Sequence, residues 1–133
     1  MSTPAPPPPG GPAGLLLSRD LIFTSKVTGT ARELGRRVLV AGNVAQASAM
    51  IEQEHPRVVF IDLTAGDLVG VPALVAYRKL AGPGTTLLAF GPHVEADALA
   101  AAAAAGCDPV LPRSKFAATL PDLIRTYLPG DGA

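Results

Sequence analysis

An aspartate that directly follows a run of apolar residues is the position in this sequence with the clearest chemical potential. Asp62 comes after residues 58–61, VVFI, and an unbroken apolar run of this kind is typical of a β-strand buried on both faces. A carboxylate there needs hydrogen bonds, a cation or a metal ion, because an unpaired buried charge is costly. We therefore keep two interpretations: a nucleophile or metal ligand, or a structural carboxylate that caps the loop Thr64–Gly70 or pairs with Arg113.

The elements that must position Asp62 form a regular alternation of short apolar segments and helical patterns. The expected strands are Gly14–Leu17, Arg37–Ala41, Val58–Ile61, Thr85–Phe90 and Pro109–Leu111. The helical patterns between and after them cover residues 23–34, 43–55, 72–82, 95–105 and 116–128. Strands joined by single helices must run parallel, with right-handed crossovers. The sequence therefore predicts an α/β fold with an open, doubly wound, five-stranded parallel sheet.

Several residues mark where these helices begin and end. Asn43 is expected to cap the second helix, with Gln46 reaching back to it as in a capping box. Gly35 and Gly106 are expected to end the first and fourth helices. Pro121 interrupts the last helical pattern, so we expect either a kink there or a turn at Ser114–Thr119 followed by a helix that starts near that proline.

The side chains that follow the strands define a candidate site, because ligands of open parallel sheets bind beyond the carboxyl ends of the strands. Asp62 follows the third strand, which we expect to be central. The other strand ends deliver Ser18, Arg19, Asp20, Gly42, Asn43, Gly91, Pro92, His93, Pro112, Arg113, Ser114 and Lys115. His55 and His93 lack any metal-ligand spacing, so we expect both to be ordinary surface or loop histidines.

Length and composition narrow the class of protein. The chain has 133 residues, with 11 basic and 11 acidic side chains, which suits one domain and disfavours binding to a nucleic-acid backbone. Cys107 is the only cysteine, so no disulfide framework is expected within the chain. There is no apolar run of about 18 residues and no signal-peptide pattern. We therefore expect a cytoplasmic protein without a membrane partner.

Composition also divides the chain along its length. Residues 1–13 are rich in proline and glycine, and we expect a disordered or polyproline-type tail there. Residues 14–128 carry the alternating pattern of strands and helices and are expected to form the domain. Residues 129–133 are expected to be a frayed end.

Several motifs in this pattern are also found together in a known family. They are the β-α order, the segment VVFIDL at 58–63, Gly70 eight residues after Asp62, and the segment FAATL at 116–120. Over residues 14–128 the chain resembles the receiver domain of two-component response regulators. The resemblance implies a flavodoxin-like (βα)5 fold, in which the aspartate at the position of Asp62 accepts a phosphoryl group from a histidine kinase. It also implies that Mg²⁺ bridges the phosphoryl oxygens, because a metal offsets the gathered negative charge.

The metal-binding part of the receiver site is altered in this sequence. Where receivers carry an acidic pair after the first strand, the matching residues are Ser18 and Arg19, a weak metal ligand and a repelling charge. Asp20 lies one residue further on, where we expect it to cap the first helix. We therefore expect no resident metal ion, with Asp20 and Asp62 as weak candidate ligands and Mg²⁺ only if Asp62 is phosphorylated.

The other receiver positions differ as well. Gly91 matches the Thr or Ser that follows the fourth strand and has no hydroxyl to reorient. Arg113 and Ser114 match the Lys-Pro pair after the fifth strand, so a charge survives with a different shape; Lys115 would serve only if the alignment slips by two residues. Val110 stands where receivers carry an aromatic switch residue. The chain thus resembles an atypical receiver, or pseudo-receiver.

Two arginines occupy positions that face Asp62 in this comparison. If Arg19 or Arg113 pairs with Asp62, the site has a permanent positive charge where Mg²⁺ sits in receivers. We hypothesise that such a pair locks one conformation without phosphate, because the hydroxyl and the aromatic residue that normally switch are missing.

These features favour a non-enzymatic, stand-alone pseudo-receiver that acts by protein–protein interaction. Its expected partner is a signalling protein such as a histidine kinase or an adaptor, and a homodimer through the face at 95–128 is a further expectation. One alternative is a single-domain response regulator that accepts phosphate on Asp62. Another is a flavodoxin-like domain that binds a small ligand, for which Ser18 alone is weak support. A dinucleotide site is not expected, because no glycine-rich loop follows the first strand.

Overall fold

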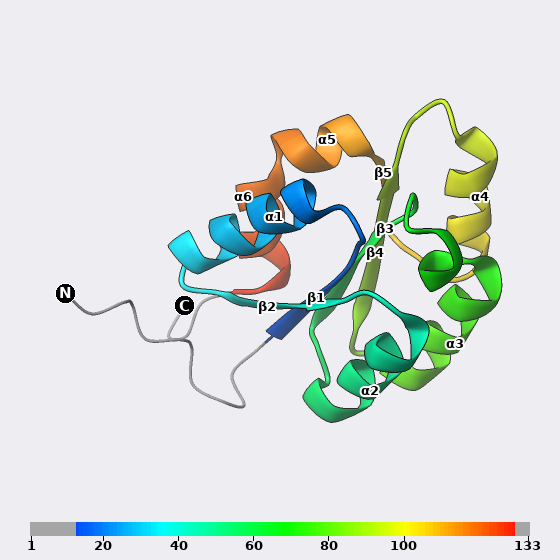
Figure 1. Ribbon diagram of the computed structural model, residues 1–133, viewed down its shortest axis with the longest axis horizontal. Helices are drawn as coiled ribbons and strands as arrows, with labels where there is room; N and C mark the ends of the chain where they lie inside the picture. The colour runs from blue at the N-terminus through cyan, green and yellow to red at the C-terminus, as the bar shows by residue number, and fades with distance from the viewer. Residues whose placement is uncertain (1–12, 130–133) are drawn as a thin grey trace.

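Five parallel strands form one sheet in the computed structural model, which describes residues 13–129 (Figure 1). The strand order is β2-β1-β3-β4-β5. The strands are β1 (Ala13–Leu17), β2 (Arg37–Ala41), β3 (Val58–Asp62), β4 (Thr86–Gly91) and β5 (Val110–Pro112). The tail was predicted at 1–13 and the frayed end at 129–133, and of these segments residues 1–12 and 130–133 lie outside the described residues. The predicted doubly wound, flavodoxin-like parallel sheet is confirmed, with β3 at its centre.

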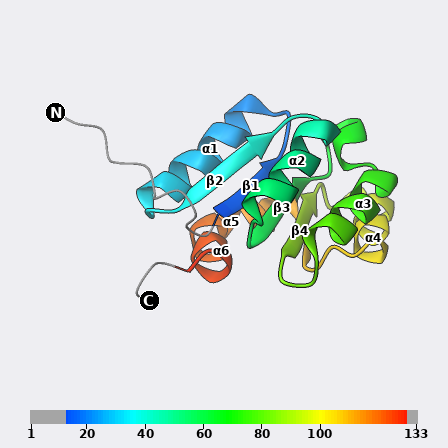
Figure 2. The same cartoon turned by 90° about the horizontal axis from the view of Figure 1, so that it is seen from below.

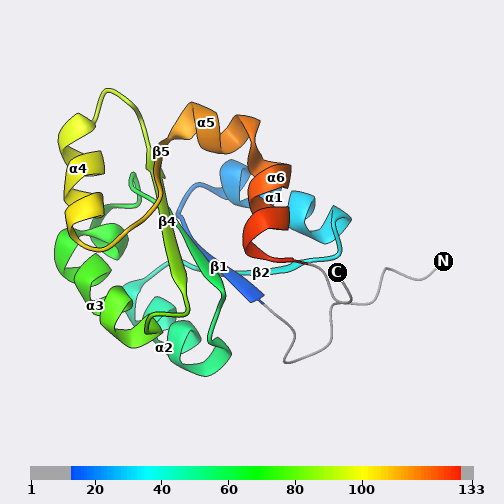
Figure 3. The ribbon, with the colours of Figure 1, turned by 180° about the vertical axis from the view of Figure 1, so that it is seen from behind.

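Helices cover both faces of this sheet. They are α1 (Leu21–Glu33), α2 (Val44–Glu54), the 3-10 helix η1 (Gly66–Val69), α3 (Val71–Ala81), α4 (Ala96–Ala104), α5 (Arg113–Ala118) and α6 (Leu120–Tyr127). Figures 1 and 3 show α2, α3 and α4 on one face and α1, α5 and α6 on the other. The view from below shows the strands lying between these two layers (Figure 2). Within the described residues, no helix is long and apolar enough to cross a membrane.

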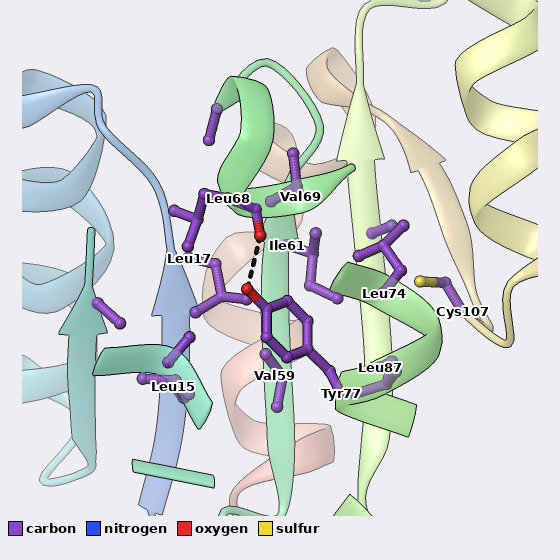
Figure 4. Packing of buried hydrophobic residues seen from close by; sticks show 14 of the residues in the cluster. Leu15, Leu17, Val59, Ile61, Leu68, Val69, Leu74, Tyr77, Leu87 and Cys107 are labelled. Carbon is purple, nitrogen blue, oxygen red and sulfur yellow. Dashed lines mark hydrogen bonds between the residues drawn. The ribbon is translucent and has the colours of Figure 1, made fainter. Parts of the chain in front are cut away.

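The core lies in two layers, because successive side chains of a strand point to opposite faces. Leu15, Leu17, Val59 and Ile61 belong to the layer under α2 and α3, where Figure 4 shows them around Tyr77. The other layer packs Leu16 and Phe60 with residues of α1, α5 and α6, including Phe23, Phe116 and Ile124. All five residues of β3 are buried, which explains why its sequence is continuously apolar before Asp62.

The predicted helix caps are present, with one difference. The side chain of Asp20 accepts a hydrogen bond from the Phe23 amide at 3.0 Å, so Asp20 is the N-cap of α1 as expected. Asn43 caps α2 by accepting from the Gln46 amide at 2.8 Å. The Gln46 side chain accepts from the Gly42 amide at 2.9 Å. The reciprocal half of the predicted capping box therefore reaches one residue further back than expected.

The predicted single helix at 116–128 is wrong. The chain enters α5 directly after β5, and the break between α5 and α6 falls at Thr119, whose φ of −112° and ψ of 15° are not helical. Pro121 lies in the first turn of α6, where its missing N–H costs no hydrogen bond. Of the two alternatives for this proline, the helix start near Pro121 is confirmed, but the expected turn at Ser114–Thr119 is wrong, because helix α5 occupies most of that segment.

Several strands differ from their predicted bounds by one residue. β1 begins at Ala13 rather than Gly14, because Ala13 pairs with Arg37 of β2; Ala13 is therefore not part of the tail. The fourth and fifth strands, β4 and β5, lie one residue further along the chain than predicted, at 86–91 and 110–112.

Candidate functional site

The Asp62 carboxylate lies at the carboxyl end of β3 with both oxygens engaged. Its side chain is only 1% exposed. The Ser18 hydroxyl donates to Oδ2 at 2.9 Å. The Thr64 amide and hydroxyl both donate to Oδ1, at 3.0 Å and 2.6 Å. Asp62 therefore caps the loop that follows β3, as one of the two interpretations of this residue expected.

Arg113, the first residue of α5, supplies the charge that faces Asp62. Its Nη1 lies 3.4 Å from Asp62 Oδ1, and its Nη2 lies 3.3 Å from Asp20 Oδ2. The guanidinium carbon lies 4.4 Å from the centre of the Phe23 ring, a geometry in which the ring face attracts a cation. A single guanidinium group thus joins two carboxylates and rests on an aromatic ring.

Each carboxylate oxygen of Asp20 has one partner within the protein. Its Oδ1 caps α1 through the Phe23 amide, and its Oδ2 pairs with Arg113. The Asp20 side chain is 46% exposed, so water also competes for it. A carboxylate with one oxygen on a helix N-terminus and the other on a guanidinium group is poorly placed to bind a metal ion.

Arg19 does not contact Asp62, so the expectation that either arginine would pair with this aspartate holds only for Arg113. Arg19 Nε donates to the Gly42 carbonyl at 3.0 Å, and Nη1 donates to the Ala65 carbonyl at 3.1 Å. Nη1 also donates to Asp67 Oδ1 at 2.8 Å. Adjacent residues of an extended chain point to opposite sides. Ser18 faces Asp62, and Arg19 therefore faces the loops after β2 and β3.

Thr64 was placed after the third strand from the sequence but was assigned no role, and Asp67 was not singled out. Thr64 gives Asp62 two of its hydrogen bonds, and Asp67 is the carboxylate partner of Arg19. The hydrogen bond from Arg19 and its positive charge hold the pKa of Asp67 below its usual value of 3.8. The Asp-x-Thr spacing at 62–64 is a signal that was available, because aspartate side chains commonly bond the amide two residues on.

Gly91 ends β4 beside a leucine that fills the adjacent space. A Cβ at Gly91 would lie 3.2 Å from the Leu63 Cβ and 3.5 Å from the Leu63 Cδ1. Next to it, between the loop after β3 and α4, is a cavity of about 380 Å³ that Thr64, Pro92, Glu95 and Leu99 help to line. At this position the protein therefore lacks a hydroxyl, and a side chain added at Gly91 would press on Leu63.

The remaining sequence candidates lie apart from Asp62. Ser114 and Lys115 are exposed on α5, and Val110 is partly buried in β5. His55 and His93 are both exposed, as expected for surface histidines. Cys107 is buried, and burial raises the pKa of its thiol to about 11. It is therefore a poor nucleophile at neutral pH.

A divalent cation does not fit the residues around Asp62. Mg²⁺ needs several oxygen ligands in a nearly octahedral arrangement. The carboxylates closest to forming such a set are Asp20 and Asp62, and the Arg113 guanidinium lies between them. Across the described part of the chain, no group of three His, Cys, Asp or Glu residues could hold a metal ion.

Comparison with known proteins gives a consistent picture of the fold. No protein-family model matches the chain, and no curated protein does. Among solved structures, a CheY-like response regulator receiver domain protein from Methanospirillum hungatei is 19% identical with a TM-score of 0.75, covering 89% of this chain and 94% of that one. The receiver domain of Ssk1 from Saccharomyces cerevisiae, crystallised with the histidine phosphotransfer protein Ypd1, is 16% identical with a TM-score of 0.74, covering 89% of each chain.

A third solved structure of similar fold contains bound groups. It is a response regulator from Burkholderia pseudomallei with a phosphorylated aspartic acid, a calcium ion and citrate. It is 18% identical with a TM-score of 0.72, and the match covers 88% of this chain and 66% of that chain. At these identities the likeness establishes the fold alone.

Proposed function

We propose that this chain, whose fold is that of receiver domains, is a signalling module that acts through protein–protein contacts and does not need phosphate on Asp62. The observation that carries the proposal is the Arg113 guanidinium, which lies between Asp62 and Asp20. An acceptor carboxylate must present a free oxygen to the incoming phosphorus atom. Here Oδ1 accepts from Thr64 and faces Arg113, while Oδ2 accepts from Ser18.

The absence of a switch supports the same proposal. A receiver that responds to phosphate needs an element with two arrangements that the phosphoryl group can bias. At Gly91 there is no hydroxyl to follow a phosphoryl group, and Leu63 crowds the place where a side chain would begin. Val110 offers no aromatic ring to follow it. We therefore propose that the surface presented to partners is constant.

We propose that the module acts by binding a partner protein through its exposed surface. Leu21 and Ile22, in the first turn of α1, are 81% and 86% exposed, and adjacent exposed large apolar side chains favour a protein contact. The proposed partner is a signalling protein, such as a histidine kinase or an adaptor, in the cytoplasm. The Ssk1 receiver domain, which was crystallised with a histidine phosphotransfer protein, supports this class of partner. A homodimer through the face at 95–128 is a second form of contact that we propose to test.

Phosphate acceptance by Asp62 is the alternative. Two observations favour it: Asp62 ends the central strand, and the regulator from Burkholderia pseudomallei carries a phosphorylated aspartic acid. For this alternative to hold, Arg113 must leave Asp62 and at least one hydrogen-bonded oxygen must become accessible. The flavodoxin-like ligand site has less support, because the Ser18 hydroxyl already donates to Asp62.

Chemical phosphorylation separates the proposal from its alternative. The protein is incubated with acetyl phosphate or phosphoramidate and Mg²⁺, beside a receiver domain that retains its acidic pair, and intact masses are measured. We expect an adduct on the reference receiver and none on this chain. A phosphate adduct that forms on the wild type and disappears in Asp62→Asn would overturn the proposal and establish the alternative.

A further inference from the structure

We infer that two arginines, Arg113 and Arg19, together do at this site what a bound divalent cation would do, and that the site therefore excludes such a cation. A cation at the carboxyl edge of this sheet would have two tasks. It would neutralise the buried Asp62, and it would tie together the loops around it. This inference goes beyond the proposed function, because it concerns the ion chemistry of the site whatever protein the chain contacts.

Arg113 performs the first task. Asp62 is the only buried charged residue in the described part of the chain, and Nη1 of Arg113 is the positive group within 4.0 Å of it. The guanidinium group lies over the face of the Phe23 ring. That ring packs in turn against Phe90 and Phe116, with ring centres 5.2 Å and 5.8 Å away. The countercharge is therefore fixed by the aromatic core.

Arg19 performs the second task. Its guanidinium joins the loop after β2, through the Gly42 carbonyl, to the loop after β3, through the Ala65 carbonyl and the Asp67 carboxylate. Because Arg19 itself follows β1, it links the carboxyl ends of three strands. It also packs closely over Gly66, where a Cβ would lie 3.3 Å from Nη1. Three loops are thus tied by one side chain.

The same two side chains keep a divalent cation out. A cation placed between Asp62 and Asp20 would have to displace Arg113, which already contacts both carboxylates. Arg19 adds a second positive charge at the same edge of the sheet. Water and the Asp67 carboxylate partly offset the charge of Arg19, so the main barrier to a cation is Arg113. The hydroxyl groups of Ser18 and Thr64, which lie beside Asp62, already donate their protons to its carboxylate.

Manganese provides a direct test, because Mn²⁺ prefers the same oxygen ligands as Mg²⁺ and broadens nearby NMR signals. The ¹⁵N-labelled protein is titrated with MnCl₂, and its amide signals are followed. We expect no saturable broadening centred on Leu63, Thr64 and Gly91. Saturable broadening of those amides in the wild type would overturn the inference.

Variants assign the exclusion to Arg113. In Arg113→Ala, the amides next to Asp62 should broaden at least tenfold more at equal MnCl₂, since the carboxylates lose their fixed countercharge. The matched control is Arg125→Ala, which removes an exposed arginine paired with Asp122 on α6 and should behave as the wild type. A folded Arg113→Ala protein without added broadening would contradict the role of Arg113. If that variant does not fold, the wild-type titration still tests whether the site excludes Mn²⁺.

Broadening of the amide signals reports cation binding, whereas the phosphate adduct reports Asp62 as a nucleophile. The inference and the proposed function can therefore fail separately.

Discussion

Nη1 of Arg113 lies 3.4 Å from Oδ1 of Asp62, so the buried carboxylate of the central strand faces a permanent positive charge. The Asp62 side chain is 1% exposed, whereas the Arg113 side chain is 29% exposed. The arginine therefore joins the buried acid to the surface of the site. This relationship gives the buried carboxylate a countercharge from within the protein.

A threonine at Gly91 would restore the hydroxyl found in receivers, but we expect it to destabilise the fold. A Cβ there meets Leu63 at 3.2 Å, and such overpacking typically costs about 1–3 kcal/mol. We expect Gly91→Thr to lower the free energy of unfolding by about 1–2 kcal/mol, as measured by urea denaturation. In the double variant with Leu63→Gly, which removes the Leu63 Cβ that the threonine meets, the threonine should cost less than it does alone. Equal costs in both backgrounds would show that Leu63 is not the obstacle. Gly84→Thr is the control, because nothing lies within 4 Å of its Cβ position.

Tyr77 should stabilise the loop after β3 through its hydroxyl. That hydroxyl donates to the Leu68 carbonyl at 2.6 Å, in the buried position that Figure 4 shows. Tyr77→Phe leaves a buried carbonyl unpaired, so we expect a loss of about 1–2 kcal/mol in the free energy of unfolding. Tyr127→Phe, which removes a hydroxyl from partly buried α6, should change it much less. A Tyr77→Phe protein as stable as the wild type would contradict the account.

The pH dependence at Tyr77 has a defined direction. Burial raises the pKa of Tyr77 above its usual value of 10.0. A raised folded-state pKa means that this stabilisation is complete below pH 10 and is lost as the pH rises through the folded-state value. The stability difference between wild type and Tyr77→Phe should therefore shrink in alkaline solution, which urea denaturation across that range measures.

The contact between Arg19 and Asp67 should be detectable in the pKa of the Asp67 carboxyl group. Arg19 holds the pKa of Asp67 below 3.8, so this ion pair stabilises the fold above that pH and is lost as the pH falls through the folded-state value. Arg19→Ala should return the pKa of Asp67 to near 3.8, as followed by the NMR shift of its carboxyl carbon. Added salt should weaken the effect in the wild type, because both side chains are solvent-accessible. An Asp67 titration unaltered by Arg19→Ala would show that the contact is not formed in solution.

The fold could be predicted from the sequence because its signals are local and repeated. Apolar runs such as 58–61 and caps such as Asp20 and Asn43 each report on a few neighbouring residues. The helices near the end of the chain were harder to predict from the sequence. The break at Thr119 depends on where β5 delivers the chain, and Pro121 alone was compatible with either a kinked helix or a new one.

The candidate site could be predicted only in part, because its contacts join distant residues. Asp62 and its partner Arg113 followed from strand-end positions, although 51 residues separate them. The side on which the Arg19 side chain lies could not be predicted from the sequence. Successive side chains after β1 point to opposite sides, so a shift of one residue decides whether a side chain faces Asp62 or the loops. The packing of Leu63 against Gly91 left no pattern in the sequence.

A double-mutant cycle on Arg113 and Asp62 tests the central claim most directly. Unfolding free energies are measured by urea denaturation for the wild type, Arg113→Ala, Asp62→Asn and the double variant. We expect Arg113→Ala alone to cost roughly 1–3 kcal/mol, less than for a fully buried pair, because water reaches Arg113. The cycle cancels the contacts of Arg113 with Asp20 and Phe23, and it should leave a favourable coupling of at least about 1 kcal/mol between Arg113 and Asp62. Costs that add to within about 0.3 kcal/mol would contradict the claim that Arg113 is the permanent partner of Asp62.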